Sequence, residues 1–380
     1  MKLGILTLVP YDNYGGILQG YALQTVLERM GHDVTIMRTK LYNWVSLKNK
    51  ILRFVWWVKD RYVKRKAGIS CLVPGTYLDY RVARIKPFID KHIHFTREFS
   101  STRDLYRFQD KSQYDGFVVG SDQTWRPCLS PDLYHMFCDF LPASSHKLRI
   151  AYAASFGVDT NEFSDVQLGI CKPLIKKFQA ISVREESGVK LCKDMFGVEA
   201  KHVLDPTMLL NKEDYLELIK DYHPLNEHVD LMQYMFFFNH EENAIIAKTS
   251  SLLNMKPVNL MTKYFLNQVQ DKSQLPDAQF LPVEEWISAY SRAKFVLTDS
   301  FHGTVFCIIF NVPFLCVSPV AIARFKSLLK VYGLEDRLVM KESEVTKDLL
   351  EKPIDWEKVN SVREVLKKQS LDFLKKSLLQ

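Results

Sequence analysis

The feature that most constrains the fold is a repeated alternation of short apolar runs with longer stretches of helical spacing. The first unit has a strand-like run at Lys2–Val9, turn formers up to Gly16, and apolar residues at helical spacing over Ile17–Met30. Gly31 stands where a helix C-cap belongs, before a strand-like run at Asp33–Met37. Further strand-like runs are Gly116–Val119, Arg149–Ala153 and Ala180–Val183. This alternation predicts a parallel sheet wound with helices.

A second alternating set follows the segment HVLDPTMLL at residues 202–210. Its strand-like runs are Leu231–Phe238, Pro257–Met261, Phe295–Leu297 and Pro313–Val317. A chain of 380 residues also exceeds the size at which one hydrophobic core usually stops growing. We therefore expect two Rossmann-like α/β domains with parallel sheets, residues 1–205 and 206–355. Residues 356–380 have helical spacing and many lysines, and we expect a helix there that can cross back to the first domain.

An insertion at about residues 41–110 interrupts the first domain. Its centre is an apolar segment with Trp56 and Trp57, followed by the basic residues Lys59, Arg61, Lys64, Arg65 and Lys66. One interpretation is a surface helix packed on the first domain. The other is a helix that contacts a membrane surface, because Trp and Lys/Arg together suit the membrane interface. The sequence leaves both open.

Composition excludes several classes of protein. The net charge of +7 is modest for this length, so we expect no nucleic-acid partner. There is no uncharged apolar run of about 18 residues, and the start MKLGILTLVP is too short for a signal peptide, so a cytoplasmic location is expected. That location allows peripheral contact with the inner face of the membrane. Seven scattered cysteines form no CxxC or Cys/His spacing, which indicates buried thiols and no metal site.

Two loops carry polar groups directly after apolar strands. The loop Asp12-Asn13-Tyr14-Gly15-Gly16 joins a strand to a helix, and its glycines let the backbone approach a ligand. The loop Ser121-Asp122-Gln123-Thr124-Trp125 follows the strand GFVV and offers a carboxylate, an amide, hydroxyls and an indole, a set typical of sugar binding. The simpler alternatives are a tight connection in the first loop and a helix cap in the second.

Two further segments indicate anion binding. Arg184 ends a hydrophobic strand, where it can hold a carboxylate or phosphate, or form an ion pair with Glu185 or Glu186. The segment Asp299-Ser300-Phe301-His302-Gly303-Thr304 opens a helix, whose N-terminus favours an anion. His302 has either a structural role or a functional one, since a bound dianion would favour its protonated form.

These segments together resemble the polysaccharide pyruvyl transferase family. The resemblance is carried by NYGGxLQxYALQ, YDGFVVGSDQTW, ISVREESG, HVLDPTMLL and TDSFHGTVFxIIFNVPFL, over about residues 1–320 apart from the insertion. It implies a GT-B-like fold with the active site in the cleft between the domains. It also implies phosphoenolpyruvate as co-substrate, with no further cofactor, and a saccharide acceptor for which lipid linkage stays open.

The resemblance matches Arg184 to the family's arginine after the strand and His302 to its histidine at the start of the second-domain helix. The local patterns described above add the other expected site residues. The residues expected to bind the donor are Arg184, His302, Ser300, Gly303, Thr304 and Arg324. The residues expected to bind the acceptor are Asp12, Asn13, Tyr14, Gly15, Gly16, Ser121, Asp122, Gln123 and Trp125. His302 is the expected general acid, and Asp122 or Asp12 accepts the hydroxyl proton. The first domain is thus the acceptor side and the second the donor side.

One position departs from the family pattern. Many members have an arginine two positions before the histidine, where this chain has Ser300. Arg324 and Lys326 are the expected substitutes for the missing anion contact. The departure leaves room for two alternatives, a GT-B-type glycosyltransferase or sugar-nucleotide epimerase, and a non-catalytic sugar-binding relative.

Overall fold

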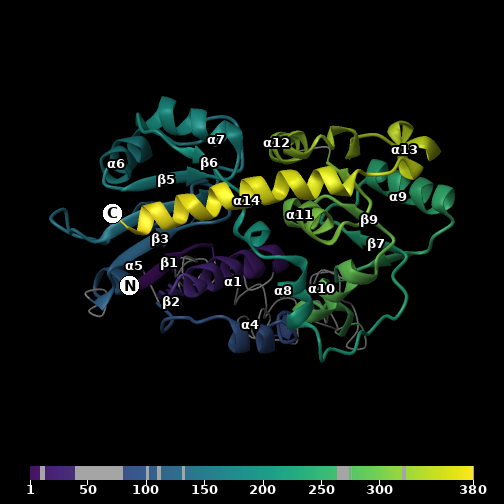
Figure 1. The fold of residues 1–380 in the computed structure, drawn as a ribbon, viewed down its shortest axis with the longest axis horizontal. Coiled ribbons are helices and arrows are strands. Elements are labelled where there is room, and N and C mark those ends of the chain that lie inside the picture. The colour runs from purple at the N-terminus through teal and green to yellow at the C-terminus, as the bar shows by residue number, and fades with distance from the viewer. Residues whose placement is uncertain are drawn as a thin grey trace, which may run out of the picture.

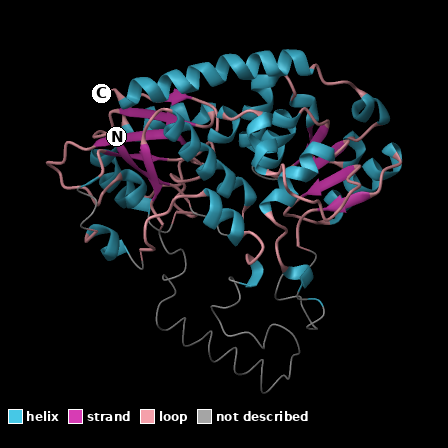
Figure 2. Ribbon diagram, turned by 60° about the horizontal axis from the view of Figure 1, so that its bottom comes forward, coloured by secondary structure: helices cyan, strands magenta, loops and turns pink. Residues whose placement is uncertain are grey.

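The computed structural model describes residues 1–8, 13–38, 80–99, 102–108, 113–130, 133–262, 274, 276–318 and 322–379. Several predictions concern residues outside these ranges: Asp12, Cys71, and the Trp56 and Trp57 segment with its basic residues. In the described part, the strands form two separate sheets, seen at the two sides of Figure 2.

The sheet of the first domain is parallel throughout. Its strands are β1 (Lys2–Leu6), β2 (Asp33–Ile36), β3 (Gly116–Val119), β4 (Leu148–Ala154), β5 (Ala180–Val183) and β6 (Lys201–His202). They lie in the order β2-β1-β3-β4-β5-β6. The carboxyl ends of all six therefore meet at one edge of the sheet, where the polar loops emerge.

The second sheet is also parallel. Its strands are β7 (Leu231–Tyr234), β8 (Pro257–Asn259), β9 (Phe295–Thr298), β10 (Phe314–Val317) and β11 (Leu338–Val339), in the order β11-β10-β9-β7-β8. The predicted fold class, two α/β domains with parallel sheets, is confirmed. The sequence did not indicate β11, because two residues are too short to show a strand period.

Helices connect the strands and cover both sheets (Figure 1). They are α1 (Tyr14–Arg29), α4 (Lys86–His92), α5 (Thr102–Tyr106), α6 (Asp165–Ile175), α7 (Glu186–Leu191), α8 (Lys212–Leu218), α9 (His240–Leu253), α10 (Val283–Arg292), α11 (Phe301–Phe310), α12 (Ile322–Tyr332), α13 (Lys347–Glu351) and α14 (Trp356–Leu378). Five short 3₁₀ helices are described: η4 (Leu133–Phe137), η6 (Pro206–Leu209), η8 (Pro276–Ala278), η9 (Glu335–Arg337) and η10 (Glu342–Glu344). The segment η5 (Cys192–Phe196) is a π-helical turn. No helix of the described part is long and apolar enough to cross a membrane.

Strand alternation divides the apolar residues between the two faces of each sheet. In β3, Phe117 and Val119 pack with α6 and its neighbours on one face, whereas Val118 packs with α1 on the other. In the second sheet, Leu297 faces α9, and Val296 faces α10 and α11. Each domain is therefore a sheet between two layers of helices.

One hydrophobic core continues from the first domain into the second. It includes Leu3 and Val118 of the first sheet, Val296 of the second and Leu374 of α14. In Figure 1, α14 runs as one long helix from the second domain back over the first. There Ser370 Oγ accepts a hydrogen bond from the Leu204 backbone N–H at 3.0 Å. The two chain ends consequently lie at the same side of the molecule.

The cysteines depart from the expectation in one place. Cys138, Cys171, Cys192, Cys307 and Cys316 are buried, but Cys128 is exposed. All six described cysteines are free thiols. Burial raises the pKa of Cys171 to about 12 and that of Cys192 to about 12, so these thiols are protonated at neutral pH.

Candidate functional site between the domains

The N-termini of two helices, one from each domain, meet between the domains. α1 follows β1, and α11 follows β9. The ring of His302, in the first turn of α11, packs on the backbone of Gly15 in α1: a Cβ atom added to Gly15 would lie 2.2 Å from His302 Nδ1. Only glycine permits this approach. Because unpaired N–H groups and a partial positive charge belong to each helix start, the junction favours an anion.

Polar residues at the two helix starts serve first as caps. Asn13 accepts a hydrogen bond from Gly16 N at 3.3 Å, and Ser300 accepts one from Gly303 N at 3.2 Å. Thr304 Oγ1 donates to the Ser300 carbonyl at 3.1 Å. The three predicted donor residues Ser300, Gly303 and Thr304 therefore build the first turn of α11. Contact with a donor stays a prediction for them.

Arg184 leaves the end of β5 and is buried among acidic side chains. It contacts Glu185 (Nε to Oε1, 2.9 Å), Asp122 (Nη1 to Oδ1, 3.4 Å), Asp205 (Nη1 to Oδ2, 3.3 Å), Ser155 (Nη2 to Oγ, 3.3 Å) and the Phe301 ring (4.1 Å from Cζ to the centroid). Burial opposes its charge, but the three carboxylates raise the pKa of Arg184 above its ordinary value. The sequence left two interpretations open for Arg184, binding of an anionic ligand or an ion pair with Glu185 or Glu186. This structure shows the ion pair with Glu185. An incoming anion would have to compete with these carboxylates.

Asp205 lies on the connection between the two sheets, 2% exposed, and receives contacts from both domains. Its Oδ1 accepts hydrogen bonds from Thr207 N at 3.0 Å and Thr207 Oγ1 at 2.7 Å. Its Oδ2 accepts one from Ser121 Oγ at 3.2 Å and lies 3.3 Å from Arg184 Nη1 and 3.5 Å from His302 Nε2. Arg184 and His302, from different domains, thus meet at one oxygen atom.

Asp205 is ionised at neutral pH in this setting. Burial raises its pKa, but the charges of His302 and Arg184 and the hydrogen bond from Thr207 outweigh burial and hold the pKa well below its usual range. Among the sequence motifs, Asp205 appears only within the segment HVLDPTMLL, with no role assigned to it. The available signal was its place, like Asp122 and Arg184, at the carboxyl end of a parallel strand.

Arg324, in α12, is the basic group of this cluster without an ion pair among the described residues. Its Nε is buried and has no hydrogen-bond partner there. Burial, and then the nearby charge of Arg184, lower the pKa of Arg324. A buried guanidinium nitrogen without an acceptor is costly, so an anion that supplied one would be stabilised here.

The GSDQTW loop divides into site residues and core residues. Ser121 contacts Asp205, and Asp122 contacts Arg184. Gln123 Oε1 accepts a hydrogen bond from Arg126 Nη1 at 3.0 Å. Trp125 is fully buried, and its Nε1–H donates to the Met136 carbonyl at 2.9 Å. The Trp125 ring also stacks on Phe137 with 5.3 Å between the ring centroids. The buried ring therefore cannot face a saccharide in this conformation. A core role replaces the predicted acceptor contact of Trp125.

Tyr14 receives a similar correction. It is 1% exposed, and its hydroxyl donates to the Leu281 carbonyl of the second domain at 2.9 Å. Its ring stacks on Trp286 with 5.5 Å between centroids. Tyr14 therefore joins the two domains. Its buried side chain has this structural role in place of the predicted contact with the acceptor. Acceptor binding by Asn13, Gly15, Gly16, Ser121, Asp122 and Gln123 stays a prediction.

Gln19 is a residue that sequence reasoning missed. It is fully buried in α1, and its Nε2 donates to Thr7 Oγ1 at 2.7 Å and to the Gly16 carbonyl at 3.1 Å. Its Oε1 accepts a hydrogen bond from Ser121 N at 3.0 Å. One amide thus fixes the end of β1, the start of α1 and the loop after β3 relative to one another. Gln19 is a specified position of the motif NYGGxLQxYALQ, which was the available signal, but the motif does not show which groups its amide contacts.

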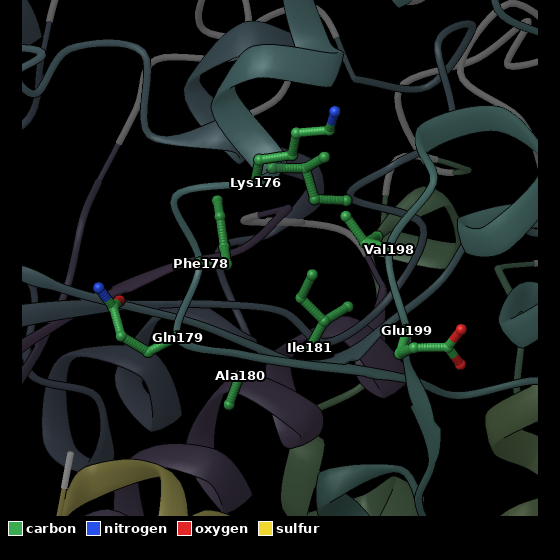
Figure 3. A pocket seen from close by; sticks show the side chains of 8 residues that line it. Lys176, Phe178, Gln179, Ala180, Ile181, Val198 and Glu199 are labelled. Carbon is green, nitrogen blue, oxygen red and sulfur yellow. The ribbon is translucent and has the colours of Figure 1, made fainter.

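A separate surface hollow of about 260 Å³ lies away from this junction (Figure 3). It is lined by Ile175, Lys176, Phe178, Gln179, Ala180, Ile181, Val198 and Glu199. These residues precede or begin β5 and β6, at the amino ends of the strands, whereas the charged cluster follows the carboxyl ends. We therefore place the candidate site at the junction. Among residues with described positions, no three His, Cys, Asp or Glu side chains gather as a metal ion would require.

Solved structures with similar folds support the architecture. UDP-GlcNAc 2-epimerase from Neisseria meningitidis, bound to UDP-GlcNAc, superposes with a TM-score of 0.56 and 9% identity, covering 100% of both chains. UGT89C1 from Arabidopsis thaliana, in complex with UDP-L-rhamnose, gives a TM-score of 0.52 and 10% identity, covering 98% of both chains. At such low identity the likeness shows a GT-B-like fold alone. No curated protein matches the chain.

Family membership comes from a comparison with family models. The model described as polysaccharide pyruvyl transferase matches residues 13–319, from the cap of α1 to two residues after β10. This range contains Asp122, Arg184, Asp205 and His302, the residues that meet between the domains. The chain belongs to the polysaccharide pyruvyl transferase family, which implies a transferase that acts in polysaccharide biosynthesis.

Proposed function

We propose that the protein transfers a pyruvyl group from phosphoenolpyruvate to two hydroxyls of one saccharide, forming a cyclic ketal. The observation that carries the proposal is the junction itself. His302 stands at a helix start beside Asp205. Arg324, whose buried Nε has no hydrogen-bond partner in the described part of the chain, lies near Arg184 and the carboxylates of Glu185 and Asp122. Cations suit the donor's carboxylate and phosphate, and a carboxylate suits the deprotonation of a hydroxyl.

The proposed reaction follows from the donor's chemistry. Arg324 and the α11 N-terminus neutralise the donor's charge and hold it in place. His302 gives a proton to the C3 methylene, so that C2 becomes electrophilic, and a sugar hydroxyl bonds to C2 as Asp122 accepts its proton. The C2–O bond to phosphate then breaks, and the phosphate leaves with the proton that Asp122 had accepted. A second hydroxyl of the same sugar bonds to C2 and closes the ketal, and its proton restores the protonated form of His302.

Arg184 has a revised place in this proposal. Since three carboxylates surround it, it organises the acidic side of the site in the conformation described. Donor binding by Arg184 would require the donor to displace at least one of these partners, as domain movement could allow. A lipid-linked acceptor fits the proposal but rests on the family's role in polysaccharide synthesis.

The test uses the purified full chain with phosphoenolpyruvate, or with UDP-GlcNAc and other nucleotide sugars. A true donor at 100 times its dissociation constant should stabilise the fold by about 2.7 kcal/mol. With a panel of saccharides, phosphoenolpyruvate should then yield free phosphate and a pyruvylated sugar detected by mass spectrometry. Stabilisation by a nucleotide sugar and not by phosphoenolpyruvate would overturn the proposal, and donor binding without phosphate release would indicate a non-catalytic relative.

A matched pair of variants links the reaction to the junction. His302→Gln should lower the rate of phosphate release about 100-fold or more, since general acid catalysis contributes that much. His223→Gln, at an exposed histidine after α8, should leave the rate unchanged. Equal rates for both variants would remove His302 from the reaction.

A further inference from the structure

We propose that Asp205 is a positioning residue for His302, fixing the orientation of its imidazole and stabilising its protonated form for proton transfer. This inference rests on the proposed function, in which His302 is the general acid. Nothing in the family match assigns a role to Asp205.

The two oxygens of Asp205 have separate partners. Oδ1 accepts both hydrogen bonds from Thr207, at 3.0 and 2.7 Å, which caps the short helix η6. Oδ2 faces the cationic groups: Arg184 Nη1 at 3.3 Å and His302 Nε2 at 3.5 Å, with Ser121 Oγ at 3.2 Å. A cap needs only Oδ1, so Oδ2 is the oxygen available for a second role.

His302 offers Asp205 only one of its nitrogens. The side chain is 5% exposed, and its Nε2 is buried without a hydrogen-bond partner in the described part of the chain. The neighbour facing Nε2 is Oδ2 of Asp205. Nδ1 is turned toward Gly15 and the start of α1. A carboxylate beside Nε2 favours the tautomer with the proton on that nitrogen, which leaves Nδ1 to exchange a proton at the junction of the two helices.

The surroundings make a compensating carboxylate necessary. His302 stands at the N-terminus of α11, where the helix dipole disfavours a cation, and Arg184 adds a positive charge nearby. Asp205 also interacts with Tyr152 of β4 and Tyr215 of α8, whose pKa values burial raises well above the ordinary value. Both tyrosines are therefore neutral. The carboxylate of Asp122 lies across Arg184 Nη1 from Asp205. Among the residues with described positions, Asp205 is the anion whose carboxylate faces the imidazole.

The substitution Asp205→Asn separates charge from structure. Asparagine is as good a helix cap as aspartate, so the Thr207 contacts can persist while the negative charge is lost. Glu185→Gln is the matched control, because it removes a carboxylate from Arg184 that has no contact with His302 among the described residues.

The primary measurement is the NMR titration of His302 in the full-length protein with isotope-labelled histidine, without donor or acceptor. Asp205→Asn should lower the midpoint of the His302 titration by about one pH unit or more, a tenfold change in proton affinity, and Glu185→Gln should move it much less. An unchanged midpoint in Asp205→Asn, or equal shifts in both variants, would overturn the inference.

A second measurement on the native chain covers the case in which Asp205→Asn does not fold. The ¹⁵N shifts of neutral His302 should show the proton on Nε2, the nitrogen that faces Asp205; a proton on Nδ1 would refute the inference. In the pyruvyl transfer assay, the high-pH limit of the rate should move down with the midpoint in Asp205→Asn, whereas a purely structural role would lower the rate equally at every pH. The NMR measurements need no substrate, so they test the role of Asp205 independently of the proposed function. The inference can therefore fail while pyruvyl transfer is observed, and it can hold while pyruvyl transfer is not observed.

Discussion

Gly15 is the residue whose size decides whether the two domains can approach each other at the site. Its Cα lies under the imidazole of His302, and an added Cβ would lie 2.2 Å from Nδ1, 2.3 Å from Cγ and 2.5 Å from Cβ of that histidine. Cβ contacts this short are steric clashes, which folded proteins essentially never contain. A change of rotamer at His302 would not relieve the clash, because the clashing atoms include its Cβ, which is fixed to the backbone.

The substitution Gly15→Ala should therefore displace His302 and loosen the junction. We expect a loss of about 1 to 3 kcal/mol in the free energy of unfolding, as for overpacking elsewhere, and loss of phosphate release from phosphoenolpyruvate. Gly169→Ala in α6 is the control, since an added Cβ there meets nothing within 4 Å, and alanine should stabilise that helix by about 0.5 to 1 kcal/mol. Native stability and activity in Gly15→Ala would contradict the close contact.

Asp299 is a second residue whose environment sets a measurable property. Its Oδ2 accepts hydrogen bonds from the backbone N–H groups of Phe236 and Phe237, at 2.8 and 2.9 Å. Burial raises its pKa to about 6, although these hydrogen bonds oppose the rise. The folded state therefore holds a proton on Asp299 between about pH 4 and pH 6, where the unfolded state has lost it.

This difference predicts a pH-dependent loss of stability. Stability contributed by protonated Asp299 is present below the unfolded pKa and is lost as pH rises through about 6. The stability of the native chain relative to Asp299→Asn, which stays neutral, should accordingly fall by about 1 to 3 kcal/mol between pH 4 and pH 7. Urea unfolding across this range measures it, with the exposed Asp372→Asn as control. A flat difference for Asp299→Asn would show that Asp299 does not retain its proton.

At the level of elements, α14 connects the domains. It packs against β4 of the first domain, against η6 on the connection between the two sheets, and against α12 of the second domain. Leu374, near its end, is fully buried in the core that the domains share. A helix of 23 residues with lysines on its outer side thus carries an apolar stripe that covers both domains.

The substitution Leu374→Ala tests this connection. It should cost about 2 to 5 kcal/mol, and calorimetry should show one shared transition at a lower temperature, because the core is continuous between the domains. Lys375→Ala, at the neighbouring exposed position, should change stability by less than about 0.5 kcal/mol. Two resolved transitions in Leu374→Ala, with only one of them shifted, would mean that the domains unfold independently.

Across the whole molecule, the predicted elements match the structure closely where apolar periodicity is strong. Gly116–Val119 and Ala180–Val183 were predicted with their observed bounds, and β1 and α1 differ from prediction mainly at their ends. The run Leu231–Phe238 was too long, because β7 ends at Tyr234. Beyond it, the carboxylate of Asp299 takes the N–H groups of Phe236 and Phe237 that a longer strand would have paired. A distant residue thus ended the strand.

Sequence alone determined the fold class, the family and the loops that bear polar groups, because periodicity, turn residues and motif order are properties of contiguous residues. Only the tertiary structure decided which of those groups meet. It buried Tyr14 and Trp125, surrounded Arg184 with carboxylates, and brought Ser121 to Asp205, a separation of 84 residues along the chain. Such contacts depend on how two sheets and the helices between them pack, and burial and charge pairing act only once that packing has formed.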